Sequence, residues 1–81
     1  MDKDAIYGRL KELLISEFKL EAGSVSPEKR LDEDFDLDSL DMVDLTLVLE
    51  DDLSQKADPS IFKGARTVQD LVDLIQPLWK L

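Results

Sequence analysis

The sequence predicts an all-α fold: a three-helix bundle with one short additional helix and a long loop between the first and second helices. Two observations support this fold class. Apolar residues recur at spacings of three and four in separate segments, and no segment alternates apolar with polar residues as a half-buried strand would. Glycine and proline fall between the periodic segments, where they mark loops. We expect residues 1–81 to form a single domain of this kind.

The first helix is expected over residues 4–18, because its apolar residues form the stripe of an amphipathic helix. From Gly23 to Asp38 the sequence is mostly polar and predicts a long loop, with Leu31 and Phe35 as its anchors. A loop of about 15–20 residues is uncommon in a compact domain and tends to be functional. The stripe of the first helix consists of Ile6, Leu10, Leu13, Leu14 and Phe18.

The second helix is expected to begin at Asp38 or Ser39 and to end near Leu53, because either side chain can cap the N–H groups of a first turn. Asp41 adds favourable negative charge there. One apolar stripe would face the core: Leu45, Leu49 and Leu53. Five further apolar residues spread around more of the helix than one core-facing band requires: Leu40, Met42, Val43, Leu47 and Val48. We expect part of this surplus to face a partner.

A short helix is expected from Pro59 to about Lys63, since proline suits a first turn and Gly64 suits a helix end. The last helix is expected to start near Thr67, where apolar residues again have helical spacing. Pro77 would end or kink this helix. Its apolar residues are Val68, Leu71, Val72, Ile75 and Leu78.

The composition excludes several classes of function. The net charge of −9 disfavours binding to nucleic acids and to anionic membrane surfaces, because both are polyanions. The chain has no cysteine and no histidine, so it lacks a thiol nucleophile and the commonest general base at neutral pH. No apolar run is long enough for a signal peptide or a membrane span. We therefore expect a cytoplasmic, monomeric protein that is not an enzyme and that favours basic partners.

The negative charge is concentrated in one window of the sequence. Residues 32–58 hold eleven acidic residues and one basic residue, whereas the rest of the chain is close to neutral. A charged face that keeps the protein soluble is one interpretation. A docking surface is the other, and we favour it because several like charges this close together destabilise the fold through mutual repulsion.

Ser39 lies within this acidic window, in the segment Asp36-Leu37-Asp38-Ser39-Leu40-Asp41. An EF-hand calcium loop is not predicted, because the positions that require glycine and a bidentate glutamate hold other residues, and we expect no specific metal site. A serine hydrolase is not predicted, because the chain has no histidine and the acids would oppose an oxyanion. Two interpretations of Ser39 remain: a helix cap, worth about 1 kcal/mol, or a hydroxyl that another protein modifies.

The segment from Phe35 to Leu45 resembles the attachment motif of acyl carrier proteins, in which the serine of an Asp-Ser-Leu triplet carries 4′-phosphopantetheine. The triplet here is Asp38-Ser39-Leu40. Length, acidity, the first helix, the long loop and Thr67-Val68-Gln69-Asp70 at the start of the last helix also match the family. The resemblance implies that a phosphopantetheinyl transferase modifies Ser39 from coenzyme A. The thiol of the arm would then carry acyl groups as thioesters.

The resemblance also implies a recognition face for partner enzymes of fatty-acid, lipid or polyketide-type synthesis. Acyl-transferring and acyl-modifying enzymes would dock on it through basic patches, and opposite charges would make that binding fast, weak and sensitive to salt. An acyl chain that folds back between the helices would gain about 0.8 kcal/mol for each buried CH₂ group. The residues implied are Asp38, Leu40, Asp41, Met42, Asp44, Leu47, Glu50 and Asp51.

The chain departs from the family pattern in two places. Many members have glycine two residues before the serine, where this chain has Leu37. Ordinary fatty-acid carriers tend to have Ile-Pro followed by an acidic third helix, whereas residues 57–64 are apolar and partly basic here. We favour a core role for Ile61 and Phe62 over an altered acyl pocket or docking site. The atypical segment suggests a specialised carrier with dedicated partners.

Two alternative functions stay open from the sequence. A carrier of amino acids, such as a peptidyl or D-alanyl carrier protein, would use the same serine and the same arm. A protein of another class, an unmodified acidic helical interaction module, would bind a basic partner through the second helix and would not need Ser39.

Overall fold

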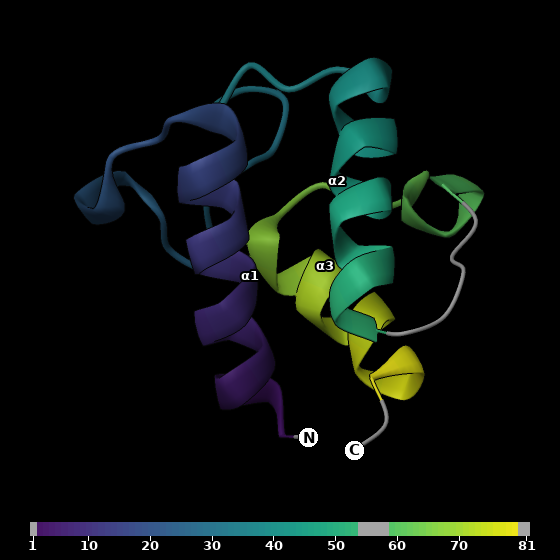
Figure 1. The fold of residues 1–81 in the computed structure, drawn as a ribbon. Coiled ribbons are helices and arrows are strands. Elements are labelled where there is room, and N and C mark those ends of the chain that lie inside the picture. Colours follow the sequence, from purple (N-terminus) through teal and green to yellow (C-terminus); the bar gives the residue numbers. More distant parts are fainter. Residues whose placement is uncertain (1, 54–58, 80–81) are drawn as a thin grey trace.

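The computed structural model describes residues 2–53 and 59–79 and has the predicted all-α architecture (Figure 1). In this part of the chain the extended pairing is limited to an isolated bridge between Arg30 and Thr67. No helix among the same residues has the length and apolar content needed to cross a lipid bilayer. The α-helices are α1 (Lys3–Phe18), α2 (Ser39–Leu53) and α3 (Val68–Ile75), and the 3₁₀ segments are η1 (Ala22–Ser24), η2 (Pro59–Phe62) and η3 (Gln76–Leu78).

Helix α1 begins one residue earlier than predicted and buries the predicted stripe. Asp2 caps it, since the Asp2 carboxylate accepts a hydrogen bond from the Ala5 N–H at 2.8 Å. The helix ends at Phe18 because Lys19 takes the left-handed conformation, with φ 55°. Phe18 packs half-buried against the core, and the rest of the stripe is buried: Ile6, Leu10, Leu13 and Leu14.

Helix α2 stands beside α1 and runs in the opposite direction (Figure 1). Its predicted core stripe is confirmed, because Leu45, Leu49 and Leu53 are buried. Thr46 is buried as well, and its hydroxyl donates to the Met42 carbonyl at 2.8 Å, which satisfies the buried polar group. Part of the apolar surplus does face away from the core: Leu40, Val43 and Leu47 are exposed.

The segment after residue 58 follows the prediction with two differences. The short helix expected over residues 59–63 is the 3₁₀ segment η2, which is one residue shorter. Helix α3 starts after Thr67, whose hydroxyl accepts from the Asp70 N–H while the Asp70 carboxylate accepts from the Thr67 N–H. The helix ends at Ile75, before Pro77, and the chain continues as η3. Proline therefore follows the end of the helix and does not kink it.

Helix α3 closes the core by packing against α1 and η2 (Figure 1). Its apolar residues Val68, Leu71, Val72 and Ile75 are buried together with Trp79. Phe62 is 2% exposed, which confirms the core role expected for it. The side chain of Ile61 and residues 57–58, which belong to the same prediction, lie outside the described residues.

The long connection between α1 and α2 is tied to the start of α3 by backbone hydrogen bonds. Leu31, one of the two predicted anchors, is buried, and Phe35, the other, is half-buried against the core. The loop is therefore an integrated part of the fold. The bonds run from the N–H of Leu31 to the carbonyl of Arg66, from Val68 to Lys29 and from Gln69 to Pro27, with N···O distances of 2.8, 3.1 and 3.0 Å.

An ion pair joins α1 to the last turn of α2. The Arg9 guanidinium donates to both oxygens of the Asp52 carboxylate, with an Nη2–Oδ1 distance of 2.9 Å, and also pairs with Glu12. The hydrogen bonds from Arg9 hold the pKa of Asp52 below the ordinary value for aspartate, while partial burial acts in the opposite direction. Asp52 therefore stays ionised at neutral pH and links the two helices.

We predict that Asp52→Asn lowers the free energy of unfolding by about 1 kcal/mol at pH 7, because it removes a bidentate pair whose carboxylate is 20% exposed. The pKa of Asp52 is lower in the native state than in the unfolded chain, where it is about 3.9. The stabilisation by the ion pair is therefore fully present above the unfolded-state pKa and is lost as the pH falls through the native-state pKa. Urea unfolding of both proteins between pH 7 and pH 3 measures the difference.

The control for this experiment is Asp51→Asn, which removes the neighbouring exposed carboxylate. It should change the free energy of unfolding by less than about 0.5 kcal/mol. The assignment fails if the gap between wild type and Asp52→Asn stays constant down to pH 3.

Candidate functional site

Ser39 is the first residue of α2, and its side chain is exposed. The cap of the helix is made by Asp38. Its carboxylate accepts from the Asp41 N–H at 3.0 Å, and the Asp41 carboxylate accepts from the Asp38 N–H at 2.9 Å. The interpretation of Ser39 as the helix cap is therefore wrong. The reciprocal pair orders the first turn and leaves the Ser39 hydroxyl outside the capping arrangement.

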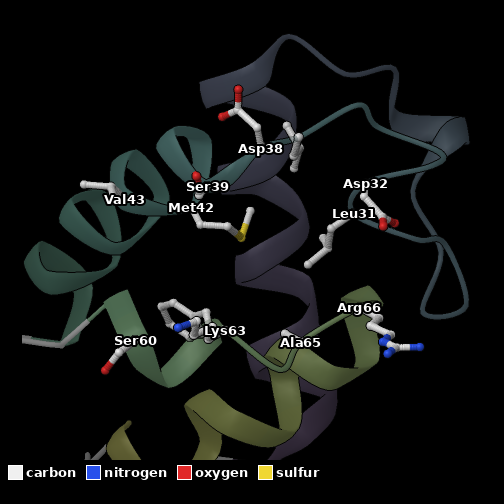
Figure 2. A pocket seen from close by; sticks show the side chains of 12 residues that line it. Leu31, Asp32, Asp38, Ser39, Met42, Val43, Ser60, Lys63, Ala65 and Arg66 are labelled. Carbon is white, nitrogen blue, oxygen red and sulfur yellow. The ribbon is translucent and has the colours of Figure 1, made fainter.

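A pocket of about 390 Å³ opens beside Ser39 (Figure 2). The long loop, the first turns of α2, η2 and the segment that leads into α3 form its walls. Figure 2 shows Met42 reaching from α2 towards Leu31 on the loop. The volume equals roughly a dozen water-sized groups, which suits a short flexible chain. The apolar lining consists of Leu31, Leu37, Met42, Val43, Phe62 and Ala65, and the polar lining of Asp32, Asp38, Ser39, Ser60, Lys63 and Arg66.

The charged groups around the pocket are divided between its walls. Asp32 and Asp38 come from the loop side, whereas Lys63 and Arg66 come from the segment between η2 and α3. The pKa of Asp32 is lowered, chiefly because its carboxylate accepts a hydrogen bond from the Glu33 N–H. Asp32 is therefore ionised at neutral pH. No group of three or more acidic, histidine or cysteine side chains is arranged to hold a metal ion within residues 2–53 and 59–79.

The residues predicted to recognise partners differ in exposure and in their distance from Ser39. Leu40 and Leu47 are 74% and 57% exposed, whereas Met42 is half-buried and lines the pocket beside Ser39. Asp51 lies about 18 Å from Ser39 along the helix axis, at a rise of 1.5 Å per residue. Of the other predicted residues, Asp38 and Asp44 are exposed, and Asp41 and Glu50 are half-buried.

Most of the chain matches a known protein family. Residues 8–75 match the family model described as the phosphopantetheine attachment site. The chain belongs to this family. It is 35% identical over 78 residues to acyl carrier protein 2 of Ralstonia nicotianae, covering 96% of both chains. It is also 36% identical over 73 residues to the acyl carrier protein of Myxococcus xanthus, covering 90% of this chain and 92% of that one.

A third relative is the meromycolate extension acyl carrier protein of Mycolicibacterium smegmatis. The identity is 36% over 76 residues, which cover 94% of this chain and 77% of the relative. The family match and these relatives confirm the predicted family, the carrier function and the prosthetic group, 4′-phosphopantetheine. The chain is a phosphopantetheine carrier with the helical fold predicted for it.

The surroundings of Ser39 fit the prosthetic group of a phosphopantetheine carrier. An exposed hydroxyl at the N-terminus of a helix suits a phosphodiester, because the N–H groups and the helix dipole of the first turn favour negative charge. The adjoining pocket suits an aliphatic chain. An arm attached at this position has two directions available, into solvent or back over the pocket.

The backbone before Ser39 explains how a carrier can lack glycine at Leu37. The left-handed residue of this segment is Asp36, with φ 56°, and not Leu37. Aspartate tolerates that conformation better than most residues, because its short polar side chain can bond locally. The Leu37 N–H donates to the Leu31 carbonyl at 2.9 Å. Leucine at position 37 is thus compatible with the backbone, because the residue that takes the left-handed conformation is Asp36.

The pocket brings in two groups of residues whose place beside Ser39 was not predicted from the sequence. Val43, expected only as part of the apolar surplus of the second helix, is 39% exposed and lines the pocket. It lies four residues after Ser39, so helical spacing was a signal that could have placed it there. Lys63, Ala65 and Arg66 reach the pocket from a segment more than 20 residues away, and no local pattern places them there. Phe62 is buried in the core, the role favoured from the sequence, and it also lines the pocket.

We predict that Asp38→Ala lowers the free energy of unfolding by about 1 kcal/mol, because it leaves first-turn N–H groups without their side-chain partner. Ser39→Ala should change it by less than about 0.5 kcal/mol, because Ser39 is exposed and does not cap the helix. Urea unfolding of the unmodified proteins measures both values. Asp38→Asn is the matched control, since asparagine caps about as well as aspartate. A loss for Ser39→Ala as large as that for Asp38→Ala would contradict the assignment.

Proposed function

We propose that Ser39 carries the 4′-phosphopantetheine arm and that the protein presents acyl thioesters on this arm to partner enzymes. The observation that carries the proposal is an exposed hydroxyl within the family motif, at the mouth of a mainly apolar pocket. The relatives are acyl carrier proteins, which favours acyl over aminoacyl cargo, and the Mycolicibacterium relative favours a place in fatty-acid or lipid synthesis. The chain itself, residues 1–81, is one carrier domain that holds the acyl group and catalyses no step.

The Ser39 hydroxyl is the nucleophile of the attachment reaction. Its Oγ attacks the β-phosphate of coenzyme A and loses its proton, a phosphodiester forms, and adenosine 3′,5′-bisphosphate leaves. A phosphopantetheinyl transferase with bound magnesium provides the catalytic groups, because this chain has no histidine. The arm supplies the thiol that the chain lacks, and that thiol forms the thioester with the acyl group.

The pocket provides a place for the acyl chain between reactions. Three apolar residues close to Ser39 in sequence line this pocket: Leu37, Met42 and Val43. Each CH₂ group that moves from water into this lining contributes about 0.8 kcal/mol. Short acyl chains therefore gain enough to fold back over the pocket, and a partner enzyme must offer a comparable apolar tunnel to draw them out.

The recognition face runs from Ser39 along the exposed side of α2. Leu40 and Leu47 supply apolar contact area, and Asp44 and Asp51 supply exposed negative charge between and beyond them. The partners that this face suits are the transferase and enzymes that transfer or modify acyl groups through basic docking patches. Charge attraction speeds the encounter and the two leucines give the contact its apolar centre. The carrier acts as a monomer, because a net charge of −9 on so small a domain opposes self-association.

We predict that incubation with coenzyme A and a broad-specificity phosphopantetheinyl transferase adds the mass of one phosphopantetheine to the wild-type chain. Ser39→Ala should gain no mass, because the attacking oxygen is absent. Intact-protein mass spectrometry measures both, and Ser60→Ala is the control, because Ser60 lines the same pocket. Addition to Ser39→Ala would overturn the assignment of the serine. No addition to wild type would favour an unmodified interaction module.

We predict that the double variant Asp44→Asn/Asp51→Asn lowers kcat/KM of the transferase by about fivefold at low salt, because it removes two exposed charges of the recognition face. The control Asp4→Asn/Glu17→Gln changes the net charge equally on exposed positions of α1 and should leave kcat/KM within about twofold. At high salt the difference should shrink, because exposed charges are screened. Equal losses in the two double variants would show that net charge alone acts, and would contradict a defined face.

A further inference from the structure

Met42 carries a thioether sulfur into the pocket beside Ser39. It lies near the start of α2, it is half-buried, and it lines the pocket. Figure 2 shows its sulfur on the pocket side of α2, directed towards Leu31 on the loop. The chain has no cysteine, and its one other methionine is Met1. Met42 is therefore the one sulfur-containing residue within residues 2–53 and 59–79.

The half-buried position of Met42 makes its oxidation both feasible and consequential. A fully buried thioether is protected from small oxidants, whereas a fully exposed one packs against nothing, so its oxidation changes little. Met42 lies between these limits. Its side chain packs against the core, and the pocket that it lines opens beside the exposed Ser39. A small peroxide can therefore reach the sulfur, and apolar contacts within the fold depend on that sulfur staying unoxidised.

The backbone of Met42 is anchored, so a change at its sulfur acts on the side-chain contacts. Its N–H donates to the Asp38 carbonyl at 3.1 Å, and its carbonyl accepts from the buried Thr46 hydroxyl at 2.8 Å. From this anchored backbone the side chain reaches across the pocket towards Leu31, whose own backbone bonds to the segment that leads into α3. Oxidation of Met42 therefore bears on how the loop packs against the start of α2.

We propose that Met42 is a site of reversible oxidation, at which a peroxide converts the thioether into a sulfoxide and loosens the packing of the loop against α2. In this step the sulfur lone pair attacks one peroxide oxygen, the O–O bond breaks, and an S–O bond forms. With hydrogen peroxide the other oxygen leaves as water, so the sulfur loses two electrons and the peroxide gains them. A methionine sulfoxide reductase reverses the step with two thiols, which become a disulfide while the oxygen leaves as water.

The sulfoxide is polar and does not suit the apolar part of the pocket lining. Its oxygen is a hydrogen-bond acceptor, and an acceptor that is buried without a donor is unfavourable. Leu37 and Val43, the apolar lining residues nearest to Met42 in sequence, offer no side-chain donor. The oxidised side chain therefore turns towards water and leaves Leu31 with less apolar contact. Loading of Ser39 by the transferase then slows as well, a consequence that rests on the proposed function.

The first test uses the unmodified full chain and hydrogen peroxide. Peptide mass mapping follows the gain of one oxygen at Met42, with N-acetylmethionine amide in the same solution as the reference. We expect Met42 to react within about tenfold of the rate of the reference, because its sulfur faces an open pocket. The melting temperature should fall by about 4–8 °C when Met42 is oxidised. Protection beyond tenfold, or oxidation of Met42 without a shift in melting temperature, overturns the proposal.

Two variants separate Met42 from other targets of peroxide. Met42→Leu keeps the apolar volume, and peroxide should leave its melting temperature unchanged. A shift equal to that of wild type would assign the effect to another residue and overturn the proposal. Met42→Gln places a polar group at the same position and should show the lowered melting temperature without peroxide.

Reversal is tested on the oxidised wild type with reductases for both sulfoxide epimers and dithiothreitol. Both the mass and the melting temperature should return to their starting values. A restored mass without a restored melting temperature would show irreversible damage and would overturn reversible oxidation at this site.

The last measurement connects Met42 to Ser39. After peroxide is removed, a phosphopantetheinyl transferase should load the oxidised wild type about three- to tenfold more slowly than the reduced protein. Treated and untreated Met42→Leu should load at one rate. Equal rates for the two wild-type forms overturn the effect on loading. No loading of either form overturns the attachment at Ser39, whereas the shift in melting temperature still decides the oxidation of Met42.

Discussion

The position of Ser39 depends on Leu31, a residue of the long loop. Its N–H donates to the Arg66 carbonyl and its own carbonyl accepts from the Leu37 N–H, at 2.8 and 2.9 Å. Its side chain is 4% exposed and forms part of the pocket. One residue thus joins the loop to the start of α3, to the backbone just before Ser39 and to the core. The loop cannot slide without losing hydrogen bonds and buried apolar area together, so the start of α2 has a fixed place.

The carboxylates of the acidic window divide by residue into those that stabilise the fold and those that remain exposed. Asp38 and Asp41 order the first turn of α2, and Asp52 pairs with Arg9 on α1. These carboxylates stabilise the fold through the bonds they accept, which offsets part of their mutual repulsion. Asp44 and Asp51 are exposed on α2. Much of the negative charge around Ser39 is therefore already compensated by hydrogen bonds within the fold.

Sequence reasoning succeeded where the signal is local. Helical spacing gave α1, α2 and α3 to within one or two residues, and it gave the buried stripe of each, since burial of one face imposes that spacing. It could not choose between Asp38 and Ser39 as the cap, because both side chains can reach the same N–H groups. It also could not find the pocket. Leu31, Ser39 and Arg66 meet there through the backbone pairing of the loop with α3, and such pairing leaves no periodic pattern in the chain.

The segment after residue 58 departs from the family pattern in its sequence without altering the fold. Phe62 is 2% exposed and packs in the core, so buried apolar contacts hold this wall of the pocket in place. Lys63 and Arg66 follow Phe62 in the sequence, and their side chains are exposed. Exposed positions can change charge at little cost in stability. Substitutions at Lys63 and Arg66 can therefore alter the charge at the pocket while buried Phe62 keeps this wall in place. The first turn of α2 has less freedom of this kind, because Asp38 and Asp41 cap the helix there.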